Sequence, residues 1–338
     1  VLLYYKYVHL GEERRSAVKD WYLQHCRAEG LRGRVRVALD GVNCTLGGSL
    51  AGLRQHIGSV IADTILQGGD IDFKLSASRG ARNSQAALES GFTTLSVKAV
   101  KEVVSLGAQG AGLSHLEGGR HVSPQEFHRL LQEETARQRQ RANRIGGGDE
   151  RAVVAEGVER LDPKTRQFSE LPKWVDENVD RLRGKRVLMY CTGGVRCEMA
   201  SALIRRHCDA DADHNRTEVL QLAGGIERYL QAYPSGREGA VGDRGGGGGG
   251  GDADAALDGG HQPAPPLGTT GDGRASVQRA GAGSMGGGAE EGFFRGKNFV
   301  FDERVSVPET PAGGMAIGHC LTCERPWDDY GSRSRCIR

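Results

Sequence analysis

The cysteine at position 191 lies in a segment whose residue types suit nucleophilic chemistry. The segment is a phosphate-loop-like turn, Cys191-Thr192-Gly193-Gly194-Val195-Arg196, and it follows the short apolar run 187–190. Two glycines let the backbone curl so that several N–H groups point at one atom. Arg196 adds a positive charge, and a helix beginning here adds the positive end of its dipole. These effects favour a thiolate, so we predict a reactive Cys191 with a lowered pKa.

The same turn would stabilise a persulfide or a bound oxyanion, and its length separates two chemistries. Cysteine phosphatases use His-Cys-x5-Arg, whereas here Tyr190 precedes the cysteine and Arg196 is the fifth residue after it. The shorter ring fits sulfur better than a phosphate ester. Cys197 could resolve an oxidised Cys191 by disulfide exchange, or it could be a packed helix residue. The alternative for Cys191 itself is a buried structural thiol.

A second group of cysteines lies near the end of the chain, at Cys320, Cys323 and Cys336. The first two have the C-x-x-C spacing of half a zinc ribbon, but structural zinc takes four ligands. His319 is the one candidate for a fourth, and it adjoins Cys320. We interpret the group as a truncated metal knuckle with a structural zinc ion. A redox-active pair and unligated surface cysteines are the alternatives.

The elements around these residues divide the chain into parts. Residues 1–106 are predicted to be an α+β domain with a ferredoxin-like split βαβ sheet. A helix is expected over 12–29 from apolar residues at i, i+3, i+4 and i+7, and another over 50–65. Strands are expected at 1–8, 34–39, 71–75 and 95–98, from β-propensity or period-two alternation. Residues 107–150 are predicted to be a linker and a helix capped at Ser123.

The alternation in the first domain predicts two different faces of its sheet. If the apolar residues point to the helices, the other face carries Arg34, Arg36, Lys74 and Lys98. An open basic sheet face is a candidate RNA-binding surface, and the alternative is a solvated polar face.

Residues 151–234 repeat strand, loop and helix, which predicts an α/β domain. The segment 236–292 holds 21 of the 52 glycines and few large apolar residues. Such a segment cannot bury enough surface to offset its ordering entropy, so we predict a disordered insertion. Residues 293–338 form a C-terminal extension with the metal-type cysteines.

The bulk composition excludes several classes of protein. The chain has 338 residues and a net charge of +2, so no global field indicates a nucleic-acid or membrane partner. No apolar run is long enough for a membrane span, and no signal peptide is visible. Eight scattered cysteines favour a reducing compartment. Because the chain begins with Val1 and ends at Arg338 inside a cysteine pattern, we expect a fragment or an incomplete gene model that could have lost a targeting segment.

Two segments of the second domain make the sequence resemble a known family. The run from Tyr190 to Ala200 and the run Gln221-Leu222-Ala223-Gly224-Gly225-Ile226 are similar to the rhodanese domain of the oxygen-dependent tRNA uridine(34) hydroxylases. Further similar stretches lie at 4–8, 33–46, 123–128 and 296–305, and plant-type, organelle-directed members are the most similar.

The resemblance implies that the chain hydroxylates the wobble uridine of tRNA to 5-hydroxyuridine with O2 and a reductant. It places the active-site cysteine at Cys191 and gives the N-terminal domain a role in holding tRNA. It also implies a location in the cytoplasm or inside an organelle such as the chloroplast. The chain departs from the family at 143–160, where an Asp-x-Arg strand is expected and only Val153-Val154 could remain of it. The rhodanese domain is therefore expected to lack its first strand.

Two other functions remain open at this point. One is a sulfurtransferase that moves sulfane sulfur from thiosulfate through a Cys191 persulfide. The other is an inactive rhodanese domain that serves as an RNA-binding module, which the missing strand favours.

Overall fold

The computed structural model describes most of the two predicted domains. The described residues are 1–66, 70–76, 91–110, 112–145, 159–165, 167–209, 216–233, 292–294, 298–300, 306–307, 320 and 323–327. Several predictions fall outside them, namely nearly all of the glycine-rich segment, the strand candidate at 153–154, His319 and Cys336. Those predictions are therefore not tested by the structure.

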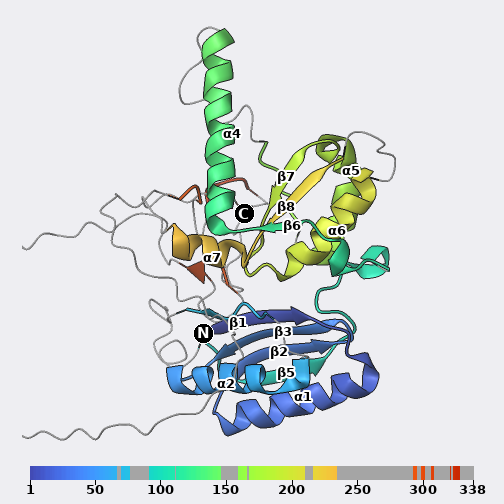
Figure 1. The fold of residues 1–338 in the computed structure, drawn as a ribbon, viewed down its shortest axis with the longest axis vertical. Coiled ribbons are helices and arrows are strands. Elements are labelled where there is room, and N and C mark those ends of the chain that lie inside the picture. The colour runs from blue at the N-terminus through green and yellow to red at the C-terminus, as the bar shows by residue number, and fades with distance from the viewer. Residues whose placement is uncertain are drawn as a thin grey trace, which may run out of the picture. The chain divides into compact units, whose positions relative to one another are not determined.

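The first domain is built on a five-stranded sheet with the order β4-β1-β3-β2-β5 (Figure 1). Its strands are β1 (Leu2–Tyr7), β2 (Arg32–Ala38), β3 (Gly41–Gly47), β4 (Lys74–Leu75) and β5 (Leu95–Ala99). Neighbouring strands run antiparallel except β5, which is parallel to β2. The first four strands and their two helices have the order of a ferredoxin-like split βαβ domain, so the predicted α+β class is confirmed.

Strand β3 did not emerge from the alternation pattern. Leu39 and Asp40 join β2 to β3, and Gly41, the first residue of β3, has a φ of +143°. A Cβ at Gly41 would lie 2.0 Å from the Lys6 carbonyl oxygen of β1, so only glycine lets β1 approach here. The hairpin places β3 in the centre of the sheet between β1 and β2.

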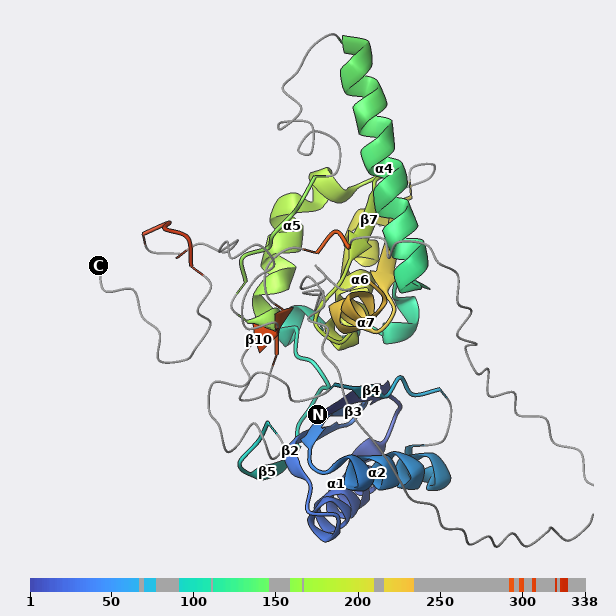
Figure 2. The ribbon, with the colours of Figure 1, turned by 90° about the vertical axis from the view of Figure 1, so that its left-hand side faces the viewer.

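Two helices, α1 (Gly11–Ala28) and α2 (Leu50–Ala62), cover one face of this sheet (Figures 1 and 2). The side chains of Val35 and Val37 point into the core beneath them, as the alternation predicts. The core also holds a polar group, because the Tyr4 hydroxyl lies 2.8 Å from both the Tyr22 hydroxyl and His56 Nε2. Hydrogen bonds of this kind offset the cost of burying polar atoms.

The second domain has a three-stranded parallel sheet with the order β6-β8-β7. Its strands are β6 (Arg120–Val122), β7 (Arg186–Met189) and β8 (Glu218–Leu222), and its helices are α4 (Pro124–Ile145), α5 (Leu171–Leu182), α6 (Val195–Asp209) and α7 (Gly225–Ala232). Helices α5 and α6 pack on one face, and α4 and α7 pack on the other. This layered arrangement confirms the predicted α/β class.

The predicted boundary at residue 151 does not coincide with the start of this sheet. Strand β6 pairs with β8 and lies in the stretch predicted to be a linker. In the described residues no strand pairs with the other edge of β7, where the Asp-x-Arg strand is expected, and residues 151–158 are outside them. As an edge strand, β7 is half-buried rather than fully buried.

The remaining elements are short: η1 (Thr64–Leu66), η2 (Gly107–Gly110), η3 (His115–Glu117), η4 (Phe168–Glu170), β9 (Asn298–Phe299) and β10 (Ser306–Val307). β9 and β10 form an antiparallel pair, and Asn298 Nδ2 lies 3.3 Å from a carboxylate oxygen of Glu227 in α7. Within the described ranges, no helix has the length and apolar character to cross a membrane.

Candidate active site

The cysteine loop, residues 191–196, connects the carboxyl end of β7 to the start of α6. This is the edge of a parallel sheet where α/β proteins place their ligands. Gly194 has a φ of +98°, and this left-handed conformation turns its N–H toward the sulfur. The Gly194 N–H donates to Cys191 Sγ over 3.1 Å. The Arg196 guanidinium lies 3.4 Å from Thr192 Oγ1 and so remains beside the loop.

These groups lower the pKa of Cys191 to about 5. The largest cause is a hydrogen bond from the Cys197 thiol, and burial opposes it. The charge of Arg196 and the backbone N–H groups of Arg196 and Gly194 lower the pKa further. A thiol with this pKa is almost fully ionised at neutral pH, the state in which a cysteine can act as a nucleophile.

Cys197 is the second thiol of the site and lies buried in the first turn of α6. Donation to Cys191, together with burial, raises its own pKa well above the usual range. Both cysteines are free thiols in the structure. The arrangement brings together the two thiols that the sequence predicted could exchange, and it adds a hydrogen bond that the sequence did not predict.

A second glycine turn supports the cysteine loop from the end of β8. Gly225 has a φ of +68°, and a Cβ there would lie 2.6 Å from the carbonyl oxygens of both Cys191 and Thr192. The Ile226 N–H donates to the Cys191 carbonyl over 2.8 Å, and the Glu227 N–H donates to the Thr192 carbonyl over 3.2 Å. The first residues of α7 therefore fix the backbone carbonyl groups of Cys191 and Thr192 by hydrogen bonds.

The first domain covers the other side of the loop with strand β1. A Cβ at Gly193 would lie 2.7 Å from Leu3, and a Cβ at Gly194 would lie 3.1 Å from the Tyr5 hydroxyl. Two glycines in the loop thus permit close contact with side chains that are almost two hundred residues away in the sequence. Sequence analysis assigned Leu3 and Tyr5 no role in the site.

Glu198 connects the two domains next to the cysteines. Its carboxylate accepts hydrogen bonds from the Tyr5 hydroxyl at 2.7 Å and from Gln221 Nε2 at 3.1 Å, and His121 Nε2 lies 2.9 Å away. Burial raises the pKa of Glu198, but the hydrogen bonds outweigh it and the net pKa is lowered. The hydrogen bond between Glu198 and His121 raises the pKa of His121. A buried carboxylate is stable only when paired in this way.

Lys74 corrects the prediction of an open basic face. Its register partner in β1 is Leu3, so it does lie on the face that points away from α1 and α2. Its side chain, however, is 1 % exposed, because Asp72, Tyr5 and the neighbouring loops cover it. A residue with this burial is not available to an RNA backbone in this structure.

The other three predicted RNA-binding residues are exposed on that face. Arg36 lies opposite Lys98 in the pairing of β2 and β5, and Arg34 lies two residues before Arg36, opposite Ser96. Arg36 is also opposite Asn43 of β3, which in turn is opposite Tyr5 of β1. The row from Tyr5 to Lys98 crosses three strand spacings, about 14 Å.

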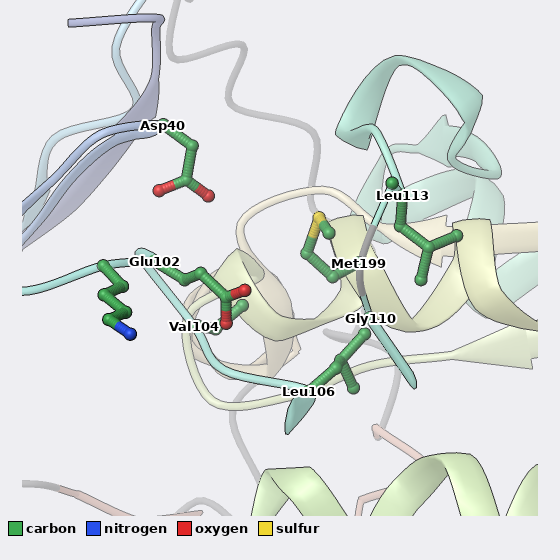
Figure 3. A pocket seen from close by; sticks show the side chains of 9 residues that line it. Asp40, Glu102, Val104, Leu106, Gly110, Leu113 and Met199 are labelled. Carbon is green, nitrogen blue, oxygen red and sulfur yellow. The ribbon is translucent and has the colours of Figure 1, made fainter. Parts of the chain in front are cut away.

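A separate cavity of about 200 Å³ is lined by Asp40, by residues of the segment 101–113 and by Met199 (Figure 3). Asp40 and Glu102 contribute carboxylates to it, and Met199 of α6 lies in its wall. The Val103 N–H donates to Asp40 Oδ1 over 2.8 Å, while burial raises the pKa of that carboxyl. No residue of the cysteine loop lines this cavity.

The C-terminal cysteines give no complete ligand set in the part of the chain that the structure describes. Cys320 and Cys323 are partly exposed, and the Cys320 N–H donates to the Arg325 carbonyl over 2.8 Å. The described residues contain no group of three or more side chains that could hold a metal ion. Two thiols fall short of the four ligands of structural zinc, so no chemistry is derived from a metal here.

Comparison with known proteins finds family matches near both ends of the chain. Residues 1–103 match the UPF0176 acylphosphatase-like domain, and residues 295–337 match the rhodanese C-terminal family. The rhodanese-like domain-containing protein 6 of Arabidopsis thaliana is 35% identical over 99% of this chain and 48% of its own length. The tRNA uridine(34) hydroxylases of Brucella abortus and Brucella melitensis are each 31% identical over 65% of this chain and 64% of their own length. The chain thus spans less than two thirds of these relatives.

Proposed function

We propose that this chain, which matches a UPF0176 acylphosphatase-like domain at its start and the rhodanese C-terminal family at its end, hydroxylates the wobble uridine of tRNA to 5-hydroxyuridine. Relatives named tRNA uridine(34) hydroxylase support the reaction class. The observation that carries the proposal is the Cys191 thiolate, which the Gly194 N–H contacts at 3.1 Å.

The proposed reaction replaces C5–H of the base by C5–OH. One oxygen atom of O2 enters uridine and the other leaves as water, while a reductant supplies two electrons and two protons. A thiolate at the end of β7 can add to an electron-poor carbon or carry an additional sulfur or oxygen atom. The N–H groups of the cysteine loop and the charge of Arg196 would stabilise the anion at each stage.

We assign the binding of the tRNA backbone to the exposed cations Arg34, Arg36 and Lys98. They share the sheet face that carries Tyr5, so a strand of RNA held by them would extend toward the cysteine loop. Neutralising phosphates releases counterions, and this makes such binding depend on salt. The alanine variants Arg36→Ala and Lys98→Ala should each weaken tRNA binding and reduce the slope of log K against log salt by about one.

The experiment that tests the reaction is mass spectrometry of tRNA from cells that depend on this protein. The expected result is 5-hydroxyuridine with the intact protein and its loss with Cys191→Ser. If the modification persists with Cys191→Ser while thiosulfate turnover disappears, the protein is a sulfurtransferase. The low pKa of Cys191 makes that second function chemically accessible, because the same loop would stabilise a persulfide anion. If the variant changes neither activity but RNA still binds, the protein is an RNA-binding module.

Two further assignments belong to this proposal. The scattered free cysteines suit a reducing compartment, either the cytoplasm or an organelle such as the chloroplast. Cys320, Cys323 and Cys336 are assigned to a zinc knuckle, which metal analysis of the protein would test directly.

A further inference from the structure

The most unusual buried group near the cysteine loop is the ammonium of Lys74. Its side chain is 1 % exposed, although lysine is almost never fully buried without a partner. Removing an ammonium from water costs several kcal/mol in real proteins, so the surrounding groups must compensate. Lys74 lies in β4, the outermost described strand on that side of the sheet, and it shares the sheet face of Leu3.

Asp72 compensates the charge and fixes the ammonium in place. Lys74 Nζ lies 2.8 Å from Asp72 Oδ2 and donates to the Asp72 backbone carbonyl over 3.3 Å. The opposite oxygen, Asp72 Oδ1, accepts a hydrogen bond from Arg228 Nε in α7 at 3.0 Å. Arg228 also donates to the Phe73 carbonyl at 2.9 Å. The carboxylate thus binds a cation from each domain.

These contacts use two of the three N–H bonds of the ammonium. No other hydrogen-bond partner of Lys74 is found among the described residues. The ammonium is a compact point charge, and with one N–H not used by these contacts it can also stabilise an anion nearby.

The neighbours of Lys74 place it beside the cysteine loop. Its Nζ lies 5.5 Å from the centre of the Tyr5 ring, and the hydroxyl of that ring packs on Gly194. Leu3, opposite Lys74 in the sheet, packs on Gly193. On the far side, a Cβ at Gly224 would lie 2.7 Å from Asp72 Oδ2. Lys74 therefore lies between the two glycine turns that hold Cys191.

We propose that Lys74 is an active-site residue that the N-terminal domain contributes to the rhodanese cysteine. Its charge stabilises the anion on Cys191 Sγ. This role does not depend on the reaction, and Cys191 does act on the pKa of Lys74 in the expected sense, by raising it against the effect of burial.

Two neutralising variants separate this role from a purely structural ion pair. Lys74→Met keeps the length of the side chain and removes its positive charge, whereas Asp72→Asn removes the negative charge that opposes it. If Lys74 acts on the sulfur, Lys74→Met raises the pKa of Cys191 and Asp72→Asn lowers it or leaves it unchanged. If the pair only joins the domains, both variants disturb the site in the same direction.

The measurement is the rate of Cys191 alkylation by iodoacetamide against pH, followed on the Cys191 peptide by mass spectrometry in the full-length protein. We expect the rate at pH 5 to fall about threefold or more with Lys74→Met, since charges near a protein surface interact by a few kcal/mol at 4 Å and by less at longer range. Lys74→Arg should restore the rate in part. An unchanged titration in a folded Lys74→Met protein would overturn the proposal.

The same variants are then assayed for 5-hydroxyuridine. If Lys74→Met shifts the titration but Cys191→Ser leaves the modification intact, the proposed reaction is wrong and the role of Lys74 stands. If Lys74→Met does not fold, as judged by circular dichroism, Lys74→Gln replaces it with a side chain that can still donate to Asp72. The signs of the Lys74→Gln and Asp72→Asn shifts then decide the question, and shifts of the same sign would refute the role of Lys74.

Discussion

Replacing Cys197 by alanine should raise the pKa of Cys191, because the Cys197 thiol is the largest contributor to the low value of about 5. A hydrogen bond to a charged group contributes about 1.5–3 kcal/mol, and one pKa unit corresponds to about 1.4 kcal/mol. The variant should therefore have a Cys191 pKa of about 6–7. Cys197 is buried and its side chain has a similar volume to serine, so the serine variant serves as the matched control.

The rate of alkylation measures the thiolate fraction directly. At pH 5 about half of Cys191 is ionised in the unaltered protein, and a rise of one to two units leaves about a tenth to a hundredth. The rate of Cys191 alkylation at pH 5 should thus fall about fivefold to fiftyfold with Cys197→Ala. At pH 9 the variant and the unaltered protein should be alkylated at similar rates. Cys197→Ser retains a donor and should stay close to the unaltered protein. The reasoning is refuted if Cys197→Ala keeps the midpoint at about 5, or if both variants shift equally.

Three other perturbations test the support of the site and the core. Gly225→Ala should lower the free energy of unfolding in urea by about 2 kcal/mol or more, because the left-handed backbone is strained for alanine and its Cβ has no space. Tyr5→Phe removes a donor from the buried Glu198 carboxylate and should lower the free energy of unfolding by about 1–3 kcal/mol. Tyr7→Phe should lower it less, because the Tyr7 hydroxyl makes a longer bond of 3.2 Å to a carbonyl. Equal losses of stability in thermal melts would contradict this ranking. Burial lowers the pKa of His56 from 6.5 to about 4, so between these pH values only the unfolded chain binds a proton at this residue. The free energy of unfolding should therefore fall by about 3 kcal/mol as the pH decreases from 6.5 to 4. An NMR titration midpoint of His56 near 6.5 in the folded protein would exclude the effect.

The sequence predicted the local part of the site well, for a physical reason. The cysteine loop is six consecutive residues, and its glycines, its arginine and the strand before it all lie within one short segment. The same holds for α1, because apolar spacing predicted both of its ends to within one residue. Where a structural feature depends on neighbours in the sequence, the pattern of residue types is enough to indicate it.

The parts that the sequence did not predict depend on contacts between distant segments. Alternation placed Lys74 on the correct face of the sheet, but nothing near residue 74 shows that Arg228 and the cysteine loop cover that face. Glu198 carried one available signal, since a charged residue directly after Cys197 occupies the first turn of a helix with a buried face. Its partner Tyr5, at a separation of 193 residues, carried none.

Two buried charges of opposite sign flank Cys191, and each is neutralised across the boundary between the domains. Glu198 of the rhodanese domain accepts from Tyr5, and Lys74 of the N-terminal domain is paired with an aspartate that Arg228 of α7 also binds. The interaction free energy of a buried ion pair offsets the desolvation of its charges only when the partners are held at short distance. The groups that lower the pKa of Cys191 most, Cys197, Arg196 and Gly194, lie in the cysteine loop and α6, and the proposed role of Lys74 would add a contribution from the N-terminal domain. Substitutions on β1 and β4, far away in the sequence, should change the reactivity of Cys191 more than substitutions in the last turns of α6, the helix that follows the cysteine loop directly.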